Sequence, residues 1–429
     1  MVTPKKNKVV YNFFSLGAVQ AISSLIQLIV VPYVVSKIGI DGFGVVAVAQ
    51  VVMLLLSALT DYGFNQTAVK NISIYRSDGV AISKIFYTVL FSKLVLCVLA
   101  FVLLGILILC IPLFRAHALL YLMAFIFVVG QSVFVNWFFQ GIEKMQFIAL
   151  LTLLARIIFL ILVFVFIERK EHDNLFLFFM GTGNFIAGLI SIYAARRILP
   201  IHFIKPSGAG ISSELRDGWR ITVANLSSFI CQYANVFILR IFTNDLLAGY
   251  YSIAERIFFT MRQALVVFSQ VIYPRVCWLM QHGRRQVIWF FRQTYFPFLM
   301  CVIGGCGLVF ILAPQILHLF IGNKSVHSLF LLRVMCLVVI IICMNIPACL
   351  VLLAANGKKG FLKIIMIGTF LNITSNIVLV QFFDEKGTAF SIVITELFIT
   401  VGLYWEVYRM YIRNKSEHES FLKLFFVNR

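Results

Sequence analysis

Charged side chains recur at helical spacing inside an apolar stretch that runs from roughly residue 246 to residue 276. Arg262 lies near its middle, about 21 Å from either end at 1.5 Å per residue. At that depth in a bilayer a charge costs at least ~2.5–3.5 kcal/mol, so it faces protein or water. Glu255 falls on the same stripe of a 3.6-residue helix, and Arg256 lies on the adjoining stripe. The pattern predicts a polar functional site; the alternative is a buried Glu255–Arg256–Arg262 network that only holds helices together.

Two further cations lie deep in apolar stretches of the first half of the chain, Lys93 and Arg156. Snorkelling of the long side chain to the interface is the alternative for Lys93. The deep acids are Glu255 and Glu396, so the interior carries a surplus of positive charge. Because guanidinium groups bind phosphate through paired hydrogen bonds, this surplus predicts an anionic, phosphate-bearing, amphipathic ligand.

Polar side chains on other apolar stretches also share helical faces. Such residues are individually more often hydrogen-bond partners between helices, worth ~0.6 kcal/mol, than ligand contacts. They lie on the first, second and seventh stretches, which together with the eighth hold equivalent positions in the two halves. This arrangement predicts a wet cavity. The residues are Gln20, Gln27, Gln50, Asp61, Gln232 and Asn235.

The composition places these residues in a membrane protein. The 429 residues are 61% hydrophobic and 12% charged, too few charges to cover the surface of a soluble protein of this length. Helices of about 20 apolar residues span a bilayer. The first stretch is too long for a signal peptide and lacks a cleavage site, so we expect it to be retained. Twelve spans are predicted, at about 10–36, 43–60, 84–112, 118–140, 147–167, 175–195, 218–242, 246–276, 295–321, 328–354, 361–382 and 388–411.

Lysine and arginine segregate to one side of these spans. With the amino terminus inside, most basic residues fall on the cytoplasmic side, which predicts that both termini are cytoplasmic. The net charge of +19 follows mostly from this topology, with a contribution from anionic membrane lipids, and indicates no nucleic-acid partner.

A stretch rich in proline, glycine and serine divides the chain near its midpoint. We expect an N-terminal six-helix lobe at 1–203, a cytoplasmic linker at 204–217 and a C-terminal six-helix lobe at 218–429. Six spans in each half give both halves the same orientation, as in a parallel repeat. The predicted fold is therefore an all-α polytopic membrane protein, with about twelve transmembrane helices in two six-helix lobes around a central cationic cavity.

Several classes of function lack their sequence signals. The nine cysteines form no CxxC pair or metal-ligand spacing, so neither disulfides nor a metal site is expected. There is no P-loop, and no cofactor is expected. The outer loops are about seven residues or fewer, too short for the catalytic loop of a membrane glycosyltransferase, so the chain is not expected to be an enzyme.

Short motifs along nearly the whole chain resemble polysaccharide flippases of the Wzx (O-antigen translocase) type. Asp61-Tyr62-Gly63-Phe64 departs mildly from the DFGF pattern of that family. The matching blocks are Pro32 to Gly39, Gly42 to Gly44, Asp61 to Asn65, Gly249 to Arg256, Ser269 to Arg275, Ala355 to Lys359, Asn372, Asn376 and Gly387 to Ala389.

This resemblance implies the fold of the multidrug/oligosaccharidyl-lipid/polysaccharide exporter superfamily and a place in the bacterial inner membrane. It also implies flipping of an undecaprenyl-diphosphate-linked oligosaccharide to the periplasmic leaflet by alternating access. Other polysaccharide-assembly membrane proteins are candidate partners. Since family members differ in their cavity residues, the roles below rest on depth and helical face. We expect Arg262 and Arg156 to hold the diphosphate, helped by Arg256 and Lys93, while Gln20, Gln27, Gln50, Gln232 and Asn235 contact sugars and Glu255, Asp61 and Glu396 are candidates for coupling to H+ or Na+.

Three alternatives stay open at this point. One is a scaffold with no transport role, which would leave the polar stripe unexplained. A multidrug exporter of the same superfamily would favour an acidic cavity for cationic drugs. A membrane polysaccharide polymerase or ligase would show a long periplasmic loop with clustered catalytic residues.

Overall fold

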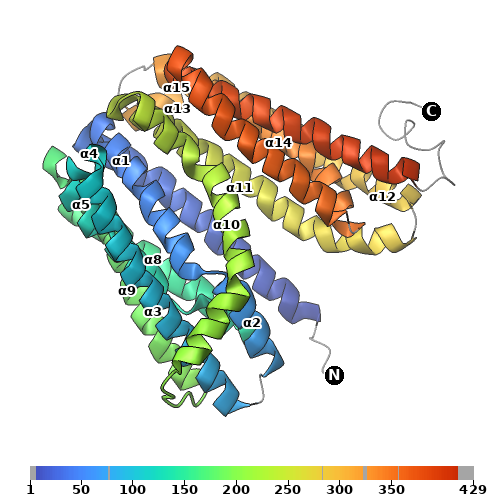
Figure 1. The fold of residues 1–429 in the computed structure, drawn as a ribbon. Helices are drawn as coiled ribbons and strands as arrows, with labels where there is room; N and C mark the ends of the chain where they lie inside the picture. Colours follow the sequence, from blue (N-terminus) through green and yellow to red (C-terminus); the bar gives the residue numbers. More distant parts are fainter. Residues whose placement is uncertain (1–5, 76–77, 283, 322–325, 356, 414–429) are drawn as a thin grey trace. The chain divides into compact units, whose positions relative to one another are not determined.

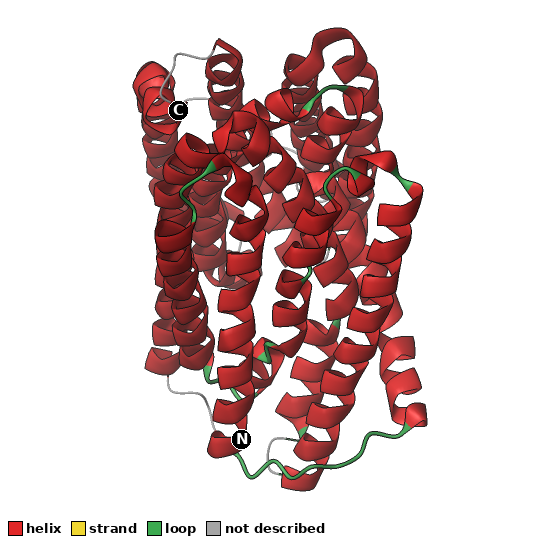
Figure 2. Cartoon of the chain, turned by 90° about the vertical axis from the view of Figure 1, so that its left-hand side faces the viewer, coloured by secondary structure: helices red, strands yellow, loops and turns green. Residues whose placement is uncertain are grey.

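The computed structural model describes residues 6–75, 78–282, 284–321, 326–355 and 357–413. Most of the described residues are helical, and the described part contains no strand (Figure 2). Short loops join the helices. The all-α fold predicted from the sequence is confirmed.

The chain forms two compact units, Met1–Phe237 and Ile238–Arg429. The helix α10, drawn in light green in Figure 1, contributes to both because the division falls within it. The lobe and linker boundaries predicted from the composition stay predictions. Unit 1 contains α1 (Lys6–Asp61), α2 (Phe64–Ile74), α3 (Gly79–Cys110), α4 (Pro112–Arg115), α5 (Ala118–Ala124), α6 (Ile126–Val133), α7 (Asn136–Gly141), α8 (Met145–Phe166), the 3-10 turn η1 (Lys170–His172), α9 (Asp173–Ile198) and most of α10 (Gly208–Phe242).

Unit 2 contains the helices that follow α10 (Figure 1). They are α11 (Asp245–His282), α12 (Arg284–Phe290), a π-helical turn η2 (Phe291–Tyr295), α13 (Phe296–Ile321), α14 (Val326–Ala354) and α15 (Lys358–Arg413). Helix α14 packs against α11, α13 and α15.

Two of the long helices contain a backbone break. In α1 it falls at Gly39, whose φ of 81° suits a residue without a Cβ. In α15 it falls at Asp384, with φ 49° and ψ −132°. Each break separates two predicted spans, so α1 and α15 each account for two of the twelve.

Among the described residues, eight helical segments are long and apolar enough to cross a membrane. Two of them, Leu25–Ile74 and Lys359–Met410, contain the breaks just described. Helices α10 and α11 cover the seventh and eighth predicted spans, and among the described residues of this region the shorter segment Tyr233–Phe242 is apolar. The polar side chains along α11 are those expected of a membrane helix that faces protein or water.

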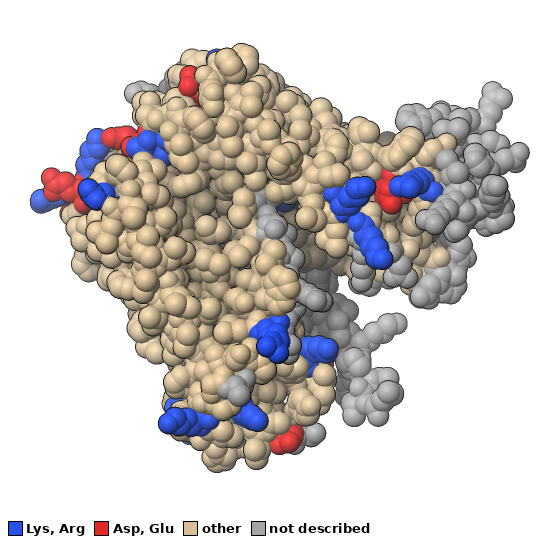
Figure 3. All heavy atoms as spheres, in the orientation of Figure 1, with Lys and Arg blue, Asp and Glu red and all other residues tan. Residues whose placement is uncertain are grey.

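The flanks of the membrane helices are apolar and exposed. On α8, for example, Leu150 is 68% exposed and Ile161 is 56% exposed. On the face shown in Figure 3, lysine, arginine and acidic side chains gather toward helix ends, and the flanks between carry other residues. Exposed apolar flanks of this size are typical of surfaces that face lipid.

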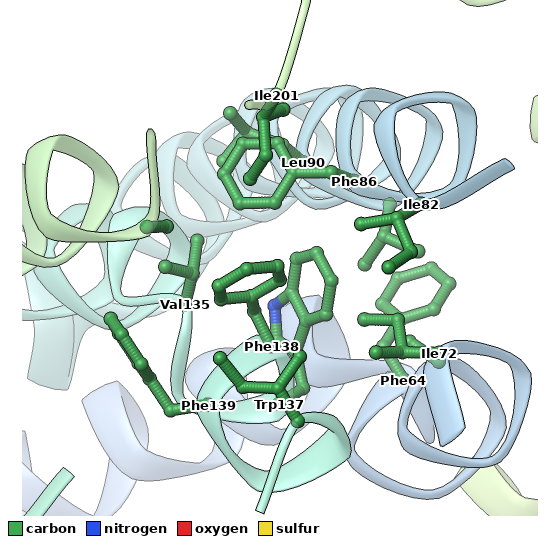
Figure 4. Packing of buried hydrophobic residues seen from close by; sticks show 14 of the residues in the cluster. Phe64, Ile72, Ile82, Phe86, Leu90, Val135, Trp137, Phe138, Phe139 and Ile201 are labelled. Atoms are coloured by element: carbon green, nitrogen blue, oxygen red, sulfur yellow. The ribbon is translucent and has the colours of Figure 1, made fainter. Parts of the chain in front are cut away.

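An aromatic cluster fixes the packing of α2, α3 and α7 in unit 1. Phe64, Phe86, Trp137 and Phe138 are fully buried, and the Phe86 and Trp137 rings lie 5.6 Å apart (Figure 4). Aromatic pairs of this kind contribute ~0.5–1.5 kcal/mol beyond their buried area. The cluster therefore gives the α2 segment, which follows the end of α1, a defined position.

Glycines bring neighbouring helices of unit 1 close together. A Cβ at Gly130 of α6 would lie 2.8 Å from the Phe185 backbone nitrogen of α9. A Cβ at Gly218 of α10 would lie 2.6 Å from the Tyr62 carbonyl oxygen. Small residues permit this close approach, which membrane helices use because lipid supplies no hydrophobic drive to pack.

Candidate functional site

Helix α11 carries a polar stripe inside unit 2. Arg262 lies about 17 residues after Asp245 and about 20 before His282, so it is near the middle of the helix. Its side chain is half-buried. Glu255, two turns earlier, is buried at 8% exposure. The predicted polar face of this helix is therefore turned partly into the unit.

The acids whose charges act on Arg256 and Arg262 of α11 lie on different helices. Glu255 interacts with the Tyr251 side chain and with the charge of Arg256, both on the same helix. The charge of Arg262 interacts with Glu396, which lies on α15. The stripe therefore divides into a group within one helix and a pair that links two helices.

Helix α14 supplies a third group to the Arg262–Glu396 pair. Asn345 Nδ2 donates to Glu396 Oε2 at 3.3 Å. The residue preceding Glu396, Thr395, accepts at Oγ1 from Asn372 Nδ2, also at 3.3 Å, and Asn372 belongs to the first arm of α15. We call Arg262, Glu396, Asn345, Thr395 and Asn372 the α11–α14–α15 site.

Several oxygen atoms of this region have no hydrogen-bond partner within the described part of the chain. They are the buried Asn345 Oδ1, Asn372 Oδ1 and Thr388 Oγ1. A buried acceptor without a donor costs ~1–3 kcal/mol unless something else satisfies it. Amide and hydroxyl oxygens accept hydrogen bonds from water and also coordinate hard cations. The described residues contain no group of three or more His, Cys, Asp or Glu side chains that could hold a metal ion.

Sequence reasoning missed Asn345 and treated Asn372 only as part of a family motif. Asn345 stands two residues before Pro347 on an apolar helix, and no local pattern links it to Glu396. Only the packing of α14 on α15 brings the two side chains together.

Unit 1 has its own ionic group, at the end of α1. Lys93 Nζ lies 2.8 Å from Asp61 Oδ1 and donates to the Gln131 carbonyl oxygen at 3.2 Å. Asn65 Nδ2 donates to Asp61 Oδ2 at 3.2 Å. The structure thus pairs a predicted ligand contact, Lys93, with a predicted ion-coupling residue, Asp61. We call these residues the Lys93–Asp61 pair.

The remaining predicted site residues lie in unit 1. Arg156 and Gln27 are half-buried on α8 and α1. Asn235 is buried on α10, and the Gln50 amide lies 4.0 Å from Met180 Sδ of α9. The side chains of Gln20 and Gln232 lie outside the described residues. Ligand contacts by these residues stay predictions.

Other ionic groups lie at turns between helices. Lys170 Nζ lies 3.0 Å from Asp41 Oδ2, with both side chains at least half exposed. Arg240 forms an ion pair with Asp245 where α10 ends and α11 begins. His327 Nδ1 lies 2.6 Å from Glu385 Oε1 beside the break in α15. Such pairs contribute little stability where they are exposed.

Comparisons with known proteins place the chain in a family. The family model described as "Polysaccharide biosynthesis protein" matches residues 9–280. A protein of Escherichia coli (strain K12) named "Putative O-antigen transporter" is 26% identical over 94% of this chain and 97% of its own length.

Two solved structures share the fold. An inward-facing multidrug resistance MATE family transporter of the MOP superfamily matches with a TM-score of 0.71 at 15% identity, covering 92% of this chain and 96% of its own. The lipid II flippase MurJ, in an inward closed conformation, matches with a TM-score of 0.69 at 12% identity, covering 95% and 94%. At these identities the likeness establishes the fold alone.

Proposed function

The chain belongs to the polysaccharide biosynthesis protein family, and from that premise we propose that it carries an undecaprenyl-diphosphate-linked oligosaccharide across a bacterial inner membrane. The proposed direction is from the cytoplasmic to the periplasmic leaflet, with both termini in the cytoplasm.

The broader class of the protein does not depend on that proposal. The predicted resemblance to O-antigen flippases is confirmed, and the chain is a multi-pass membrane transporter of the flippase type. It is not an enzyme, so the polymerase or ligase alternative is excluded.

The observation that carries the proposal is the position of Arg262. A guanidinium near the middle of a membrane helix requires a compensating charge, and Glu396 provides one. An anionic ligand offers the same compensation. In the proposed cycle a phosphate group replaces Glu396 on Arg262, and Glu396 returns when the ligand leaves. Through this exchange the charge of Arg262 is compensated both with and without the bound ligand.

A diphosphate suits the site better than a single carboxylate does. Guanidinium donates two parallel hydrogen bonds to phosphate oxygens, and a diphosphate accepts from more than one cation. Arg256 on α11 and Arg156 in unit 1 are the further cations in this proposal. Lys93 is left out because Asp61 already holds its ammonium group. The lipid tail stays in the bilayer while the two lobes alternate in access.

Glu396 is the acid that we propose couples transport to an ion. When the ligand replaces it on Arg262, its carboxylate keeps the hydrogen bond from Asn345 and needs a new positive partner. A proton or Na+ supplies that charge, and the nearby amide oxygens without donors are suitable ligands. Glu255 and Asp61 are weaker candidates, because Glu255 interacts with groups on its own helix and Asp61 forms a direct ion pair with Lys93. We propose no cofactor.

The sugar contacts, the membrane lipids as partners, and other polysaccharide-assembly proteins belong to the same proposal. Gln27 is half-buried on α1, so its amide is the most accessible of the described amides predicted to contact sugars.

A multidrug exporter is the second candidate function, and the fold it shares with a MATE transporter is its support. A site for cationic drugs needs a surplus of acid, whereas the polar stripe of α11 presents Arg256 and Arg262 beside the buried Glu255. The two functions separate in a deletion strain. If the protein is a flippase, the deletion strain loses surface polysaccharide and its drug susceptibility is unchanged. If the protein is a drug exporter, the deletion strain becomes more susceptible to drugs and keeps its surface polysaccharide.

Substitution of Arg262 tests the proposal. We expect Arg262→Ala to abolish surface polysaccharide at a normal protein level, because no charge remains to hold the diphosphate. Arg262→Lys keeps the charge without the paired hydrogen bonds and should retain part of the activity. Immunoblots of membranes and gels of surface polysaccharide measure both.

Arg275→Ala is the matched control. Arg275 lies on the same helix but is exposed and stacks on Trp278 at 4.5 Å, near the end of α11. Its loss should leave polysaccharide at the normal level. Normal polysaccharide from a stably expressed Arg262→Ala would contradict the proposed role.

A further inference from the structure

Lys93 is a cation held deep within unit 1. It lies about 14 residues, or ~21 Å, past the start of α3, and 1% of its side chain is exposed. A lysine ammonium has three N–H donors, and acceptors from α1 and α6 take two of them. The Lys93 ammonium is therefore bound by groups of the protein itself, and its geometry is not that of a cation exposed to a ligand.

Its partner Asp61 stands where α1 ends. The next two residues have left-handed backbone conformations, Tyr62 with φ 38° and Gly63 with φ 72°, and α2 begins at Phe64. One carboxylate oxygen of Asp61 binds Lys93 of α3, and the other accepts from Asn65 of α2. The carboxylate therefore ties three helices together across the break.

Packing around the break leaves little room for it to change. The Tyr62 carbonyl lies against Gly218 of α10, where even a Cβ would come within 2.6 Å. On the other side Phe64 is fully buried in the aromatic cluster. The ion pair is thus the polar element of a closely packed corner.

We propose that Lys93 is a built-in counter-cation for Asp61, taking the place that an external cation such as Na+ would otherwise fill. If the protein is the proposed flippase, this inference implies that unit 2 binds the coupling ion, and that implication rests on the proposed function. The role of Lys93 as a positioning residue within unit 1 does not rest on the proposed function.

The oxygen atoms around the ammonium are those that would bind Na+ in its absence. They are the Asp61 carboxylate and the Gln131 carbonyl oxygen. Asn65, which donates to the same carboxylate, has a buried Oδ1 without a hydrogen-bond partner among the described residues. Carboxylate and amide oxygens are the ligands that hard cations prefer. Because the Lys93 ammonium is attached to the chain, its effective concentration at these oxygens is high, and it excludes dissolved Na+ from them.

Lys93→Met tests this proposal, because it keeps an unbranched apolar side chain and removes the charge. The readout is the thermal unfolding midpoint of the purified full-length protein, in NaCl and in choline chloride at equal ionic strength. In choline chloride we expect the midpoint to fall by roughly 5 °C or more. NaCl should recover at least half of this loss, beyond the salt response of the wild type.

Three further variants show whether charge is the cause. Asp61→Asn combined with Lys93→Met should return the midpoint toward the wild-type value and abolish the added response to Na+. Lys93→Arg should stay close to the wild type. Lys170→Met removes a lysine from the exposed pair with Asp41 and is the matched control; it should shift the midpoint by about 1 °C or less.

Two outcomes would overturn the proposal. In the first, Lys93→Met gains no Na+ response and stays equally unstable when Asp61→Asn is added, which indicates packing alone. In the second, the wild type shows a Na+ response that Asp61→Asn removes, which means that Asp61 takes an external cation beside Lys93. If Lys93→Met gives no folded protein, recovery of membrane expression by Asp61→Asn supports the proposal, and no recovery overturns it. None of these results depends on transport, so failure of the proposed flippase function would appear separately.

Discussion

The two units solve the same electrostatic problem differently. In unit 1 the Lys93–Asp61 pair joins a fully buried ammonium to a carboxylate whose second oxygen is also hydrogen-bonded. In unit 2 the charges of a half-buried arginine and a half-buried glutamate attract each other through space, with amide oxygens near the glutamate that lack donors. The charges of the first group are in direct contact at 2.8 Å, although Asn65 Oδ1 beside them also lacks a donor, and the charges of the second group keep capacity for an additional partner. The difference suggests that unit 1 holds its geometry while unit 2 responds to the ligand.

Neutralising the acid in each unit should show this difference most strongly. Asp61→Asn leaves the buried Lys93 charge without a partner, and we expect a loss of ~3–5 kcal/mol in unfolding free energy. Glu396→Gln should cost less, because the Arg262 side chain is only half-buried. Equilibrium unfolding of the purified variants measures both losses. Equal losses would remove the distinction between the two groups.

The close packing beside the Asp61 break offers a second, smaller test. Gly218→Ala places a methyl group 2.6 Å from the Tyr62 carbonyl oxygen, and we expect it to cost ~1–3 kcal/mol. Gly304→Ala on α13 is the control, since no heavy atom lies within 4 Å of the new Cβ. Its effect should stay within about 0.5 kcal/mol. Thermal unfolding reports both, and a harmless Gly218→Ala would mean that the corner is not rigid.

Gln50 provides the smallest expected effect. Its buried amide lies against Met180 within unit 1, so Gln50→Leu should cost ~0.6 kcal/mol or less and leave surface polysaccharide unchanged. Quantified polysaccharide from cells with matched protein levels tests this. A severe loss of polysaccharide would instead favour the predicted sugar contact, and would make unit 1 a direct participant in ligand binding.

Much of the fold followed from hydropathy alone. Apolar stretches of bilayer length predicted the helices, and the breaks at Gly39 and Asp384 fall between predicted spans. The polar stripe of α11 was visible because its residues repeat with the helical period.

The partners of the charges did not follow from the sequence. Helical spacing suggested Glu255 as the neighbour of Arg262, about 10 Å away on the same stripe. In the structure Glu255 interacts instead with Tyr251 and Arg256. The acid whose charge acts on Arg262 is Glu396, which lies 134 positions further along the chain. Such a pairing depends on how helices pack, which local periodicity does not specify. The same is true of Lys93 and Asp61.

The most direct test of the central claim is transport by the purified protein. Proteoliposomes would contain undecaprenyl-diphosphate-linked oligosaccharide, and an added glycosidase would report its arrival in the opposite leaflet. We predict flipping by the wild type and by Arg275→Ala, partial flipping by Arg262→Lys, and none by Arg262→Ala. Flipping by Arg262→Ala at the wild-type rate would contradict the claim that this arginine holds the diphosphate.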